Sequence, residues 1–379
     1  MSIPNPVHWY YYLVIAGSVI FCFLSLTNAI YLTLYSKKPS LTTGPRVSVL
    51  VPARDEEKNI GRCLDSLLNQ TYRDYEIIVY DDMSGDKTWE IISQYAARNP
   101  VVKAVKGTEL PEGWYGKPHA MQELAKHASG EYFLFTDADT VHGPQSVSWA
   151  VTNALAYRTD VLSGYTHQKA ESFGEVAVLS NMYLNAVLFM PLWLIPVIKL
   201  PFASHIIGQF IFFKATVFKA MGGYTSVRHN ISEDVYMGRE LKKRGHRLVF
   251  LDVQNHVSCR MYRSFYEAIQ GIAKNIYDFF EKHVISIVAL TVFISGGLVL
   301  PVVLLPLGIL THGPNVHLAA TAVGLFFAAW TLFLYNRGMP WYAPLLYPFL
   351  FILLIYIAWK SVIDDTLGKG YLWKGRFVK

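Results

Sequence analysis

The chain has 379 residues, of which 52% are hydrophobic and 16% are charged. This composition is too apolar for an ordinary soluble protein and predicts a soluble domain joined to membrane segments. The net charge of +6 suits anionic lipid headgroups and phosphates, and the absence of a basic stripe excludes nucleic acid as an expected partner. Three scattered cysteines, Cys22, Cys63 and Cys259, lack metal-ligand spacing, so neither a disulfide framework nor a zinc site is expected.

An N-terminal membrane anchor is predicted within residues 1–38. Residues 9–35 are almost entirely apolar and exceed the ~20 residues that a helix needs to cross a bilayer. They lack the charged start and the small-residue cleavage site of a signal peptide, so the anchor is expected to stay uncleaved. Because Lys37 and Lys38 follow this run and no charge precedes it, the positive-inside rule puts the next domain in the cytosol.

Residues 46–282 form the predicted soluble domain, in which short apolar strands alternate with amphipathic helices. Strands are expected at 47–51, 76–80, 101–105, 132–135 and 160–165. Helices are expected at 59–70 and 149–157, together with one that ends near 97, one that begins after 118 and one that begins at 232. This alternation predicts an α/β fold with a doubly wound, Rossmann-like and mainly parallel sheet whose two faces are covered.

A long apolar run interrupts this domain at residues 176–213. Pro191, Pro196 and Pro201 argue against a single membrane span there. We expect a pair of interfacial helices lying on the membrane. A buried core segment or a re-entrant piece is the open alternative.

The C-terminal region, 284–360, contains three further runs of spanning length, at 284–310, 317–335 and 341–359. Three crossings would leave the basic tail, 361–379, outside the cell, whereas its charge predicts the inside. One run is therefore expected not to cross fully. Pro301 and Pro306 make the first of the three the candidate for a re-entrant hairpin.

Paired carboxylates directly follow one of the predicted strands. Asp137 and Asp139 end the run 132–135, with no lysine or arginine nearby in sequence. Ligands of open α/β sheets bind at the carboxyl ends of the strands, and paired aspartates there suit a hard divalent cation that also holds a diphosphate. A polar loop is the alternative for an isolated Asp-x-Asp, so the residues at the other strand ends decide between a metal site and a loop.

Charged or flexible residues follow the other strands as well. The loops that contain Arg54 to Glu57 and Asp81 with Asp82 offer carboxylates that can accept hydrogen bonds from a base or a ribose. Farther on, Gly116 lets backbone approach a ligand and Lys117 is a point charge suited to phosphate. Helix capping or surface exposure is the alternative reading of the two acidic loops.

A transfer reaction also needs a base for the acceptor. Asp234, in the sequence Ser232-Glu233-Asp234, begins a predicted helix and could take a proton from an acceptor hydroxyl. The alternative is that Ser232 and Glu233 cap the helix and Asp234 is a first-turn acid. The sequence leaves both readings open.

Four motifs in order resemble the signatures of family-2 glycosyltransferases of the GT-A fold. They are residues 51–60 (VPARDEEKNI), Asp81-Asp82-x-Ser84-x-Asp86, Asp137-x-Asp139 and Glu233-Asp234, within about residues 46–275. The resemblance implies inverting transfer of a sugar from a nucleoside diphosphate, with Asp139 and Asp137 at a Mg or Mn ion and Asp234, beside Glu233, as the base. It also implies donor contacts from Pro52, Ala53, Arg54, Glu56, Asp81, Asp82, Lys117, Asp137 and Lys274.

Within that family, Gly113-Trp114-x-Gly116-Lys117, Lys274-Asn275 and the tail 373–376 are similar to membrane-bound enzymes that glycosylate carotenoid acids, hopanoid-type lipids and ceramide. The Gln-x-x-Arg-Trp motif of polymer-making and ceramide-type relatives is missing, since residues 270–275 read QGIAKN. The resemblance therefore favours a multi-pass, metal-dependent hexosyltransferase that uses a UDP-sugar and a lipid acceptor. A processive polysaccharide synthase and a transporter with a nucleotide-binding domain are the alternatives.

Overall fold

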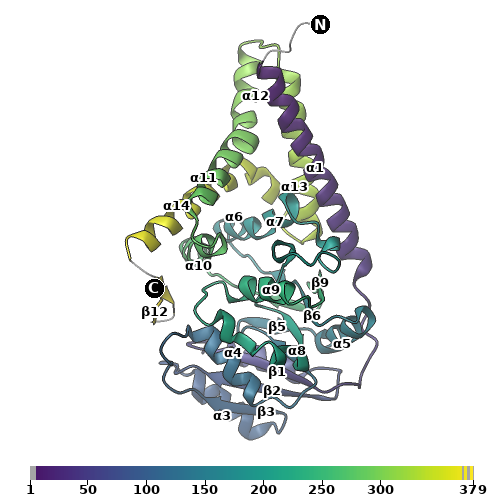
Figure 1. The fold of residues 1–379 in the computed structure, drawn as a ribbon, viewed down its shortest axis with the longest axis vertical. Coiled ribbons are helices and arrows are strands. Elements are labelled where there is room, and N and C mark those ends of the chain that lie inside the picture. The colour runs from purple at the N-terminus through teal and green to yellow at the C-terminus, as the bar shows by residue number, and fades with distance from the viewer. Residues whose placement is uncertain (1–5, 369–370, 374–375, 379) are drawn as a thin grey trace.

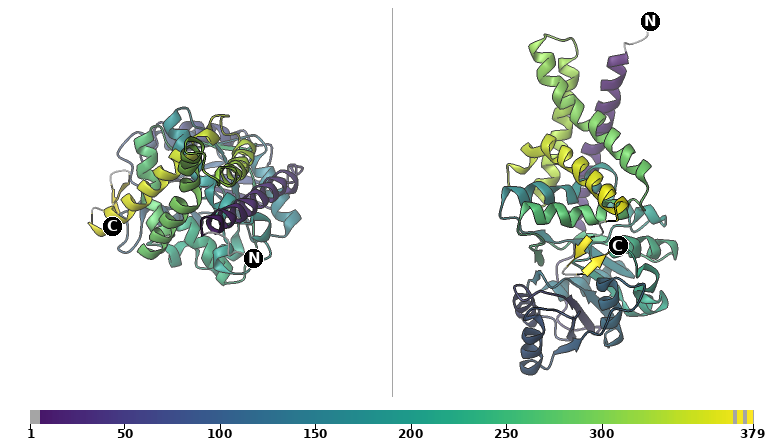
Figure 2. Two further views of the ribbon diagram at one scale, coloured as in Figure 1. Left: turned by 90° about the horizontal axis from the view of Figure 1, so that it is seen from above. Right: turned by 90° about the vertical axis from the view of Figure 1, so that its left-hand side faces the viewer.

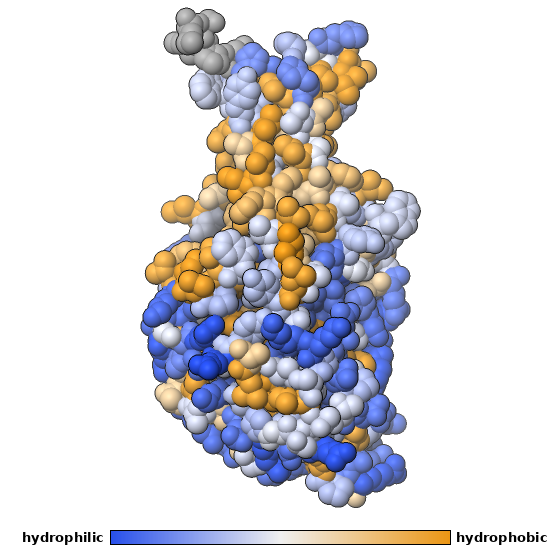
Figure 3. Space-filling model, turned by 90° about the vertical axis from the view of Figure 1, so that its right-hand side faces the viewer, coloured by the Kyte–Doolittle hydropathy of each residue, from blue (hydrophilic) through white to orange (hydrophobic). Residues whose placement is uncertain are grey.

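The computed structural model describes residues 6–368, 371–373 and 376–378. An α/β domain forms one end of the molecule, and long apolar helices extend away from it toward the N-terminus (Figure 1). Hydrophobic residues gather around these helices and on the adjoining part of the domain, whereas the far end of the domain is mainly hydrophilic (Figure 3).

A seven-stranded sheet in the order β3-β2-β1-β4-β8-β6-β9 organises the α/β domain. Its strands are β1 Val47–Ala53, β2 Tyr75–Asp81, β3 Val102–Lys106, β4 Tyr132–Phe135, β6 Val161–Tyr165, β8 Ile211–Lys214 and β9 Leu248–Asp252. Every neighbouring pair is parallel except those made by β8, which runs antiparallel to both β4 and β6. The predicted α/β fold with a mainly parallel sheet is therefore confirmed.

Helices cover this sheet, and a small second sheet lies beside it. The helices are α2 Ile60–Leu68, α3 Thr88–Arg98, α4 Gly116–Lys126, α5 Ser146–Tyr157, α8 Ala215–Ala220, α9 Glu233–Lys243 and α10 Phe265–Phe279. The second sheet joins β5 Thr140–His142, β10 Val257–Cys259 and β7 His167–Gln168. It was not predicted, because strands of two or three residues show no periodicity.

Most side chains of the apolar run 176–213 are buried in the core. It contributes most of α6 Phe173–Leu179, then α7 Leu184–Leu188 and most of the central strand β8. A strand buried on both faces is a continuous apolar run in sequence, so it cannot be told from a buried helix by pattern alone. Exposed apolar side chains occur only between α7 and β8 in this run, at Phe189, Trp193, Val197, Leu200 and Phe202.

Among the described residues, four helical segments are long and apolar enough to cross a membrane. They are α1 Pro6–Tyr35, the run 284–310, α13 Val316–Asn336, and α14 Tyr347–Thr366 with the turn before it. Seen from above, α1 lies beside the other apolar helical segments (Figure 2). Arg337, buried at the end of α13, pairs with Asp252 at 2.8 Å and ties this bundle to the sheet.

The predicted re-entrant hairpin at 284–310 is wrong. The run is one continuous helix built from α11 Val284–Phe293, a π-helical turn at Ile294–Val299, and α12 Leu300–Leu310. The hydroxyls of Tyr10 and Tyr347 donate to the carbonyls of Gly296 (2.7 Å) and Leu298 (2.6 Å). These bonds supply partners to carbonyls of the irregular turn, so the helix continues through it.

The last apolar segment differs from the others, because the chain contacts the α/β domain on both sides of it. Before α14, Tyr342 stacks on Phe173 with ring centroids 6.1 Å apart. At its other end, Asp365 in the last turn of α14 pairs with Lys282 at 2.7 Å. The segment therefore begins and ends against the domain. Three of the basic residues of the predicted tail, 361–379, lie outside the described residues, namely Lys369, Lys374 and Lys379.

Candidate active site

The loops after β1, β2 and β4 and the starts of α4 and α9 surround a cavity of about 1780 Å³. All but one of the predicted site residues line it: Pro52, Ala53, Arg54, Glu56, Asp82, Lys117, Asp137, Asp139, Glu233, Asp234 and Lys274. The exception is Asp81, which is 1% exposed and lies behind the cavity wall. The tertiary structure thus brings the four sequence motifs, Lys117 of α4 and Lys274 of α10 into one site.

Hydrogen bonds join the loops after β1 and β2 into a single wall. The Arg54 guanidinium donates to the carbonyls of Asp82 and Met83. In return, Asp55 accepts from the Gly85 N–H at 2.7 Å. The side chains of Ser84 and Asp86 accept from the N–H groups of residues 55 and 57. The serine and the second aspartate of this motif therefore shape the loop, while Asp82 faces the cavity.

Lys117 holds the two sides of the cavity together. Its Nζ lies 2.8 Å from Asp137 Oδ1 and 3.1 Å from Glu233 Oε1. Burial disfavours the charged amine, but Asp137 and Glu233 outweigh burial and raise the pKa of Lys117 well above its usual value. Gly208 permits this approach, because a Cβ there would lie 3.0 Å from Nζ. Lys117 is therefore a permanent cation beside the paired carboxylates.

We expect Lys117→Ala to weaken binding of a nucleoside diphosphate sugar by about tenfold or more, because the carboxylates of Asp137 and Glu233 would lose their counter-charge and repel the diphosphate. Titration calorimetry with UDP-glucose and GDP-mannose measures this effect. The matched control is Lys126→Ala, a surface substitution on the same helix. Unchanged donor affinity in Lys117→Ala would contradict the phosphate role.

Asp234 lies in the first turn of α9, and both of its carboxylate oxygens accept hydrogen bonds from backbone N–H groups. Oδ2 accepts from the Gly208 N–H at 2.9 Å, and Oδ1 accepts from the Val235 N–H at 2.8 Å. Burial and the neighbouring Glu233 raise the pKa of Asp234 to about 6, against the opposing effect of Lys117. The Ser232 side chain makes no capping bond to α9. The Asp234 carboxylate is therefore fixed in the cavity wall, and its raised pKa would suit a proton acceptor near neutral pH.

Asp137 and Asp139 present carboxylates without further protein ligands for a metal ion. Among the described residues, no group of three or more His, Cys, Asp or Glu side chains is arranged to hold one. Magnesium commonly binds one or two carboxylates and completes its shell with substrate phosphates and water. The cavity wall carries more carboxylates than lysines and arginines, so a diphosphate bound there needs added positive charge. The side chains present therefore fit a cation that the donor itself helps to hold.

A buried polar network beneath the Asp137 loop was not predicted. The ring of His142 lies within hydrogen-bond distance of Thr136, Thr140 and Ser146, at 3.0, 3.2 and 3.0 Å. Burial lowers the pKa of His142 to about 3, so the ring is neutral and bridges these hydroxyls. The network fixes the backbone on both sides of Asp137-Ala138-Asp139. The dense Thr and His residues after the strand were its only signal in the sequence.

Asp139 also has partners that come from distant parts of the chain. The buried Cys259 thiol on β10 hydrogen-bonds to Asp139. Burial, together with the nearby Asp139 carboxylate, raises the pKa of the Tyr262 phenol. No local pattern links these residues to the Asp-x-Asp motif. Only the pairing of Cys259 with Thr140 between β10 and β5 brings them together.

The opposite end of the same cavity is apolar and reaches α11 and α14, which belong to segments long and apolar enough to cross a membrane. It is lined by Phe189 and Phe202, by Leu290 and Phe293 of α11, and by Leu354 of α14. The rings of Phe189 and Phe293 contact each other with centroids 5.6 Å apart. One cavity therefore connects the charged site to helices of membrane-spanning length.

Comparison with known proteins identifies similar sequences. The family model described as glycosyl transferase family 2 matches residues 48–221. The chain is 38% identical over 104 residues to poly(ribitol-phosphate) beta-glucosyltransferase of Bacillus spizizenii, covering 27% of this chain and 16% of that protein. It is 37% identical over 112 residues to 4,4'-diaponeurosporenoate glycosyltransferase of Staphylococcus haemolyticus, covering 30% of this chain and 29% of that protein. These matches span less than a third of either relative.

A solved structure extends the similarity of fold over nearly the whole chain. The mannosyltransferase PcManGT of Pyrobaculum calidifontis, in complex with GDP-Man and Mn²⁺, has a TM-score of 0.55 at 20% identity. The match covers 94% of this chain and 99% of that one. Residues 48–221 therefore form a glycosyl transferase family 2 domain, and the chain has the GT-A fold.

Proposed function

We propose that this protein is an inverting, membrane-bound glycosyltransferase that moves a sugar from a nucleoside diphosphate sugar, most simply a UDP-sugar, to a membrane lipid. The single observation that carries this proposal is the cavity that joins the Lys117 and Asp234 cluster to the apolar residues of α11 and α14. A water-soluble donor suits the charged end, and the tail of a lipid suits the apolar end. The carotenoid-type relative supports an acceptor of this kind.

In the proposed reaction, an acceptor hydroxyl attacks the anomeric carbon on the face opposite the diphosphate. Asp234 takes the hydroxyl proton as the new carbon–oxygen bond forms, and the bond to the diphosphate breaks with its electron pair going to the leaving group. Lys117 offsets part of the charge on that leaving group. Single in-line displacement inverts the configuration at the anomeric carbon.

Asp139 and Asp137 are the proposed ligands of a divalent cation, Mg or Mn. Held by these carboxylates, such a cation would supply Lewis-acid neutralisation of the leaving diphosphate. The Mn²⁺ complex of the mannosyltransferase with the same fold supports this choice. The loop itself is held ready by the neutral His142 beneath it.

The proposed domain organisation is an N-terminal anchor, a catalytic α/β domain and C-terminal membrane helices. An anchor within 1–38, a catalytic domain from 46 to 282 and membrane helices within 284–360 are supported by α1, the run 284–310 and α13. Contacts to the domain at both ends of α14 suggest that it does not cross. Crossings by α1, the run 284–310 and α13 alone would then leave the domain and the tail on the same side of the membrane. The lysines after α1 favour the cytosolic side.

The proposed base predicts a pH dependence. Asp234 acts only when ionised, and its pKa of about 6 makes kcat/KM fall about tenfold per pH unit below that value and level off above it. Transfer assays between about pH 4.5 and 8.5 measure this profile. A midpoint near the ordinary aspartate value would contradict the effect of burial on this carboxyl.

The proposal is tested with purified protein in detergent. Hydrolysis of UDP-glucose, UDP-GlcNAc and GDP-mannose is measured with and without added Mg or Mn, and the best donor is then incubated with lipid extract or with poly(ribitol phosphate). A glycolipid detected by mass spectrometry is the expected product. Sugar transferred to the polymer alone, or no turnover of any donor, would overturn the proposed acceptor or the proposed activity, respectively.

A further inference from the structure

Two consecutive residues before β8, Gly208 and Gln209, connect the proposed base to the paired carboxylates. The Gly208 N–H donates to Asp234 at 2.9 Å. The Gln209 carbonyl accepts from the hydroxyl of Thr136 at 2.9 Å, and Thr136 directly precedes Asp137. In an in-line displacement the sugar ring lies between the leaving diphosphate and the base. The backbone of Gly208 and Gln209 therefore runs along the part of the cavity wall between the two groups that a bound sugar would separate.

The Gln209 side chain is oriented by a buried hydrogen-bond network. Its Oε1 accepts from Gln168 Nε2 at 2.7 Å and from the hydroxyl of Thr166. Gln168 Nε2 also donates to that hydroxyl at 2.7 Å. Two donors therefore fix one end of the amide, and neither Thr166 nor Gln168 belongs to the residues that line the cavity.

The other end of this amide has no hydrogen bond. Gln209 is 3% exposed and forms part of the cavity wall, and its Nε2 has no hydrogen-bond partner anywhere in the described chain. Buried polar groups in native proteins almost always have a partner. A donor without one, in the wall of a binding cavity, is suited to a partner that the ligand supplies.

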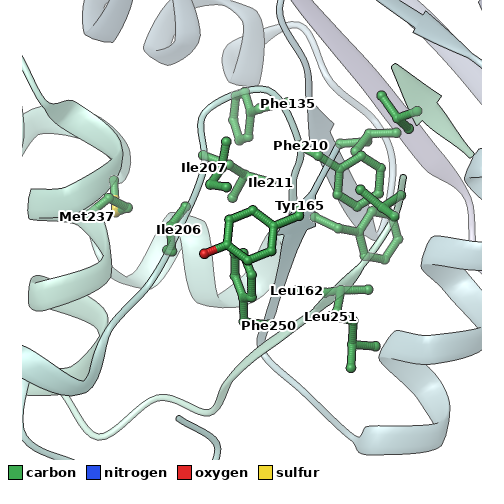
Figure 4. Packing of buried hydrophobic residues seen from close by; sticks show 14 of the residues in the cluster. Phe135, Leu162, Tyr165, Ile206, Ile207, Phe210, Ile211, Met237, Phe250 and Leu251 are labelled. Atoms are coloured by element: carbon green, nitrogen blue, oxygen red, sulfur yellow. The ribbon is translucent and has the colours of Figure 1, made fainter. Parts of the chain in front are cut away.

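The residues on both sides of Gln209 restrict movement of the backbone that carries its side chain. Ile207 precedes the pair, and Phe210 and Ile211 follow it in the buried core that Phe135 and Tyr165 share (Figure 4). These apolar side chains lie on both sides of the pair in the sequence. The amide is therefore held in place before any ligand binds, which lowers the entropy lost on binding.

We propose that Gln209 recognises the sugar of the donor, with its amide nitrogen donating a hydrogen bond to one ring hydroxyl, and that Thr166 and Gln168 are positioning residues that orient it. This inference rests on the proposed function and specifies that Gln209 binds the sugar part of the donor. A hydroxyl is a suitable partner because it accepts from the amide and can donate its own hydrogen onward. Gln209 thus contributes to sugar selectivity and not to nucleotide affinity.

The test compares wild-type protein with Gln209→Met, which keeps the length of the side chain and removes its amide. Titration calorimetry with Mn²⁺ gives the affinities for UDP-glucose and GDP-mannose and for UDP and GDP. For the donor that binds, analogues that each lack one ring hydroxyl are added. Gln168→Met tests the positioning role, and Gln145→Met, at an exposed glutamine outside the cavity, is the matched control.

We expect Gln209→Met to bind the nucleotide sugar about tenfold more weakly and the free nucleotide as wild type does. We also expect wild type to bind one deoxy analogue about tenfold more weakly than the parent sugar, and the variant to bind both equally. Gln168→Met should show a smaller loss of the same discrimination. Equal losses for nucleotide and nucleotide sugar, or discrimination that survives in Gln209→Met, would overturn the inference alone. Wild type that binds neither donor would overturn the proposed function with it.

Discussion

Replacing Asp234 by asparagine is expected to lower turnover at least ~10²-fold while the affinity for the nucleotide sugar stays near that of wild type. Asparagine can still accept from the Gly208 N–H, so the start of α9 keeps its hydrogen bond. What it loses is the ability to take a proton from the acceptor. Steady-state transfer assays give the turnover, and calorimetry with the donor gives the affinity.

Glu240→Gln, a carboxylate farther along the same helix that pairs with Arg244, is the control for general effects on α9. It should transfer sugar at the wild-type rate. If Asp234→Asn instead lost donor binding as much as it lost turnover, Asp234 would belong to the donor site. Glu233, which is paired with Lys117, would then become the candidate base.

Asp139→Asn is expected to abolish transfer and to remove any stimulation by Mg or Mn, because a neutral amide is a much poorer ligand for a hard cation. Donor-dependent Mn²⁺ binding, followed by calorimetry, should disappear in the same variant. The surface change Asp65→Asn on α2 serves as the control. Wild-type activity that persists in EDTA would reject the metal role of this carboxylate.

The alternation of strands and helices in the sequence predicted most of the nucleotide half of the molecule. The strands β1, β2 and β4 and the helices α2 and α4 were expected within a few residues of their observed bounds. This success has a local cause, since each element carries its own apolar periodicity and its own turn residues. Carboxylates at strand ends, such as Asp82 and Asp139, could be predicted as site residues for the same reason, because their position after a strand is visible in the local sequence.

Elements whose identity depends on their neighbours were missed. The strand β8 is buried between β4 and β6, so it has the same apolar sequence as a core helix or a membrane segment. The run 284–310 contains Pro301 and Pro306 but remains one helix, because hydroxyls of α1 and α14 bond to carbonyls of its irregular turn. Such compensation comes from partners far away in sequence.

The sequence by itself determined the fold class, the apolar helices and the acidic residues of the site, because strand periodicity, helix length and charge are local properties. Only the tertiary structure decided that Lys117 pairs with Asp137 and Glu233, and that the backbone of Gly208 and Gln209 links Asp234 to Thr136, which precedes Asp137. It also decided that one cavity reaches from Asp234 to α11. These relations depend on the order of strands in the sheet and on the packing of helices, which no short stretch of sequence encodes.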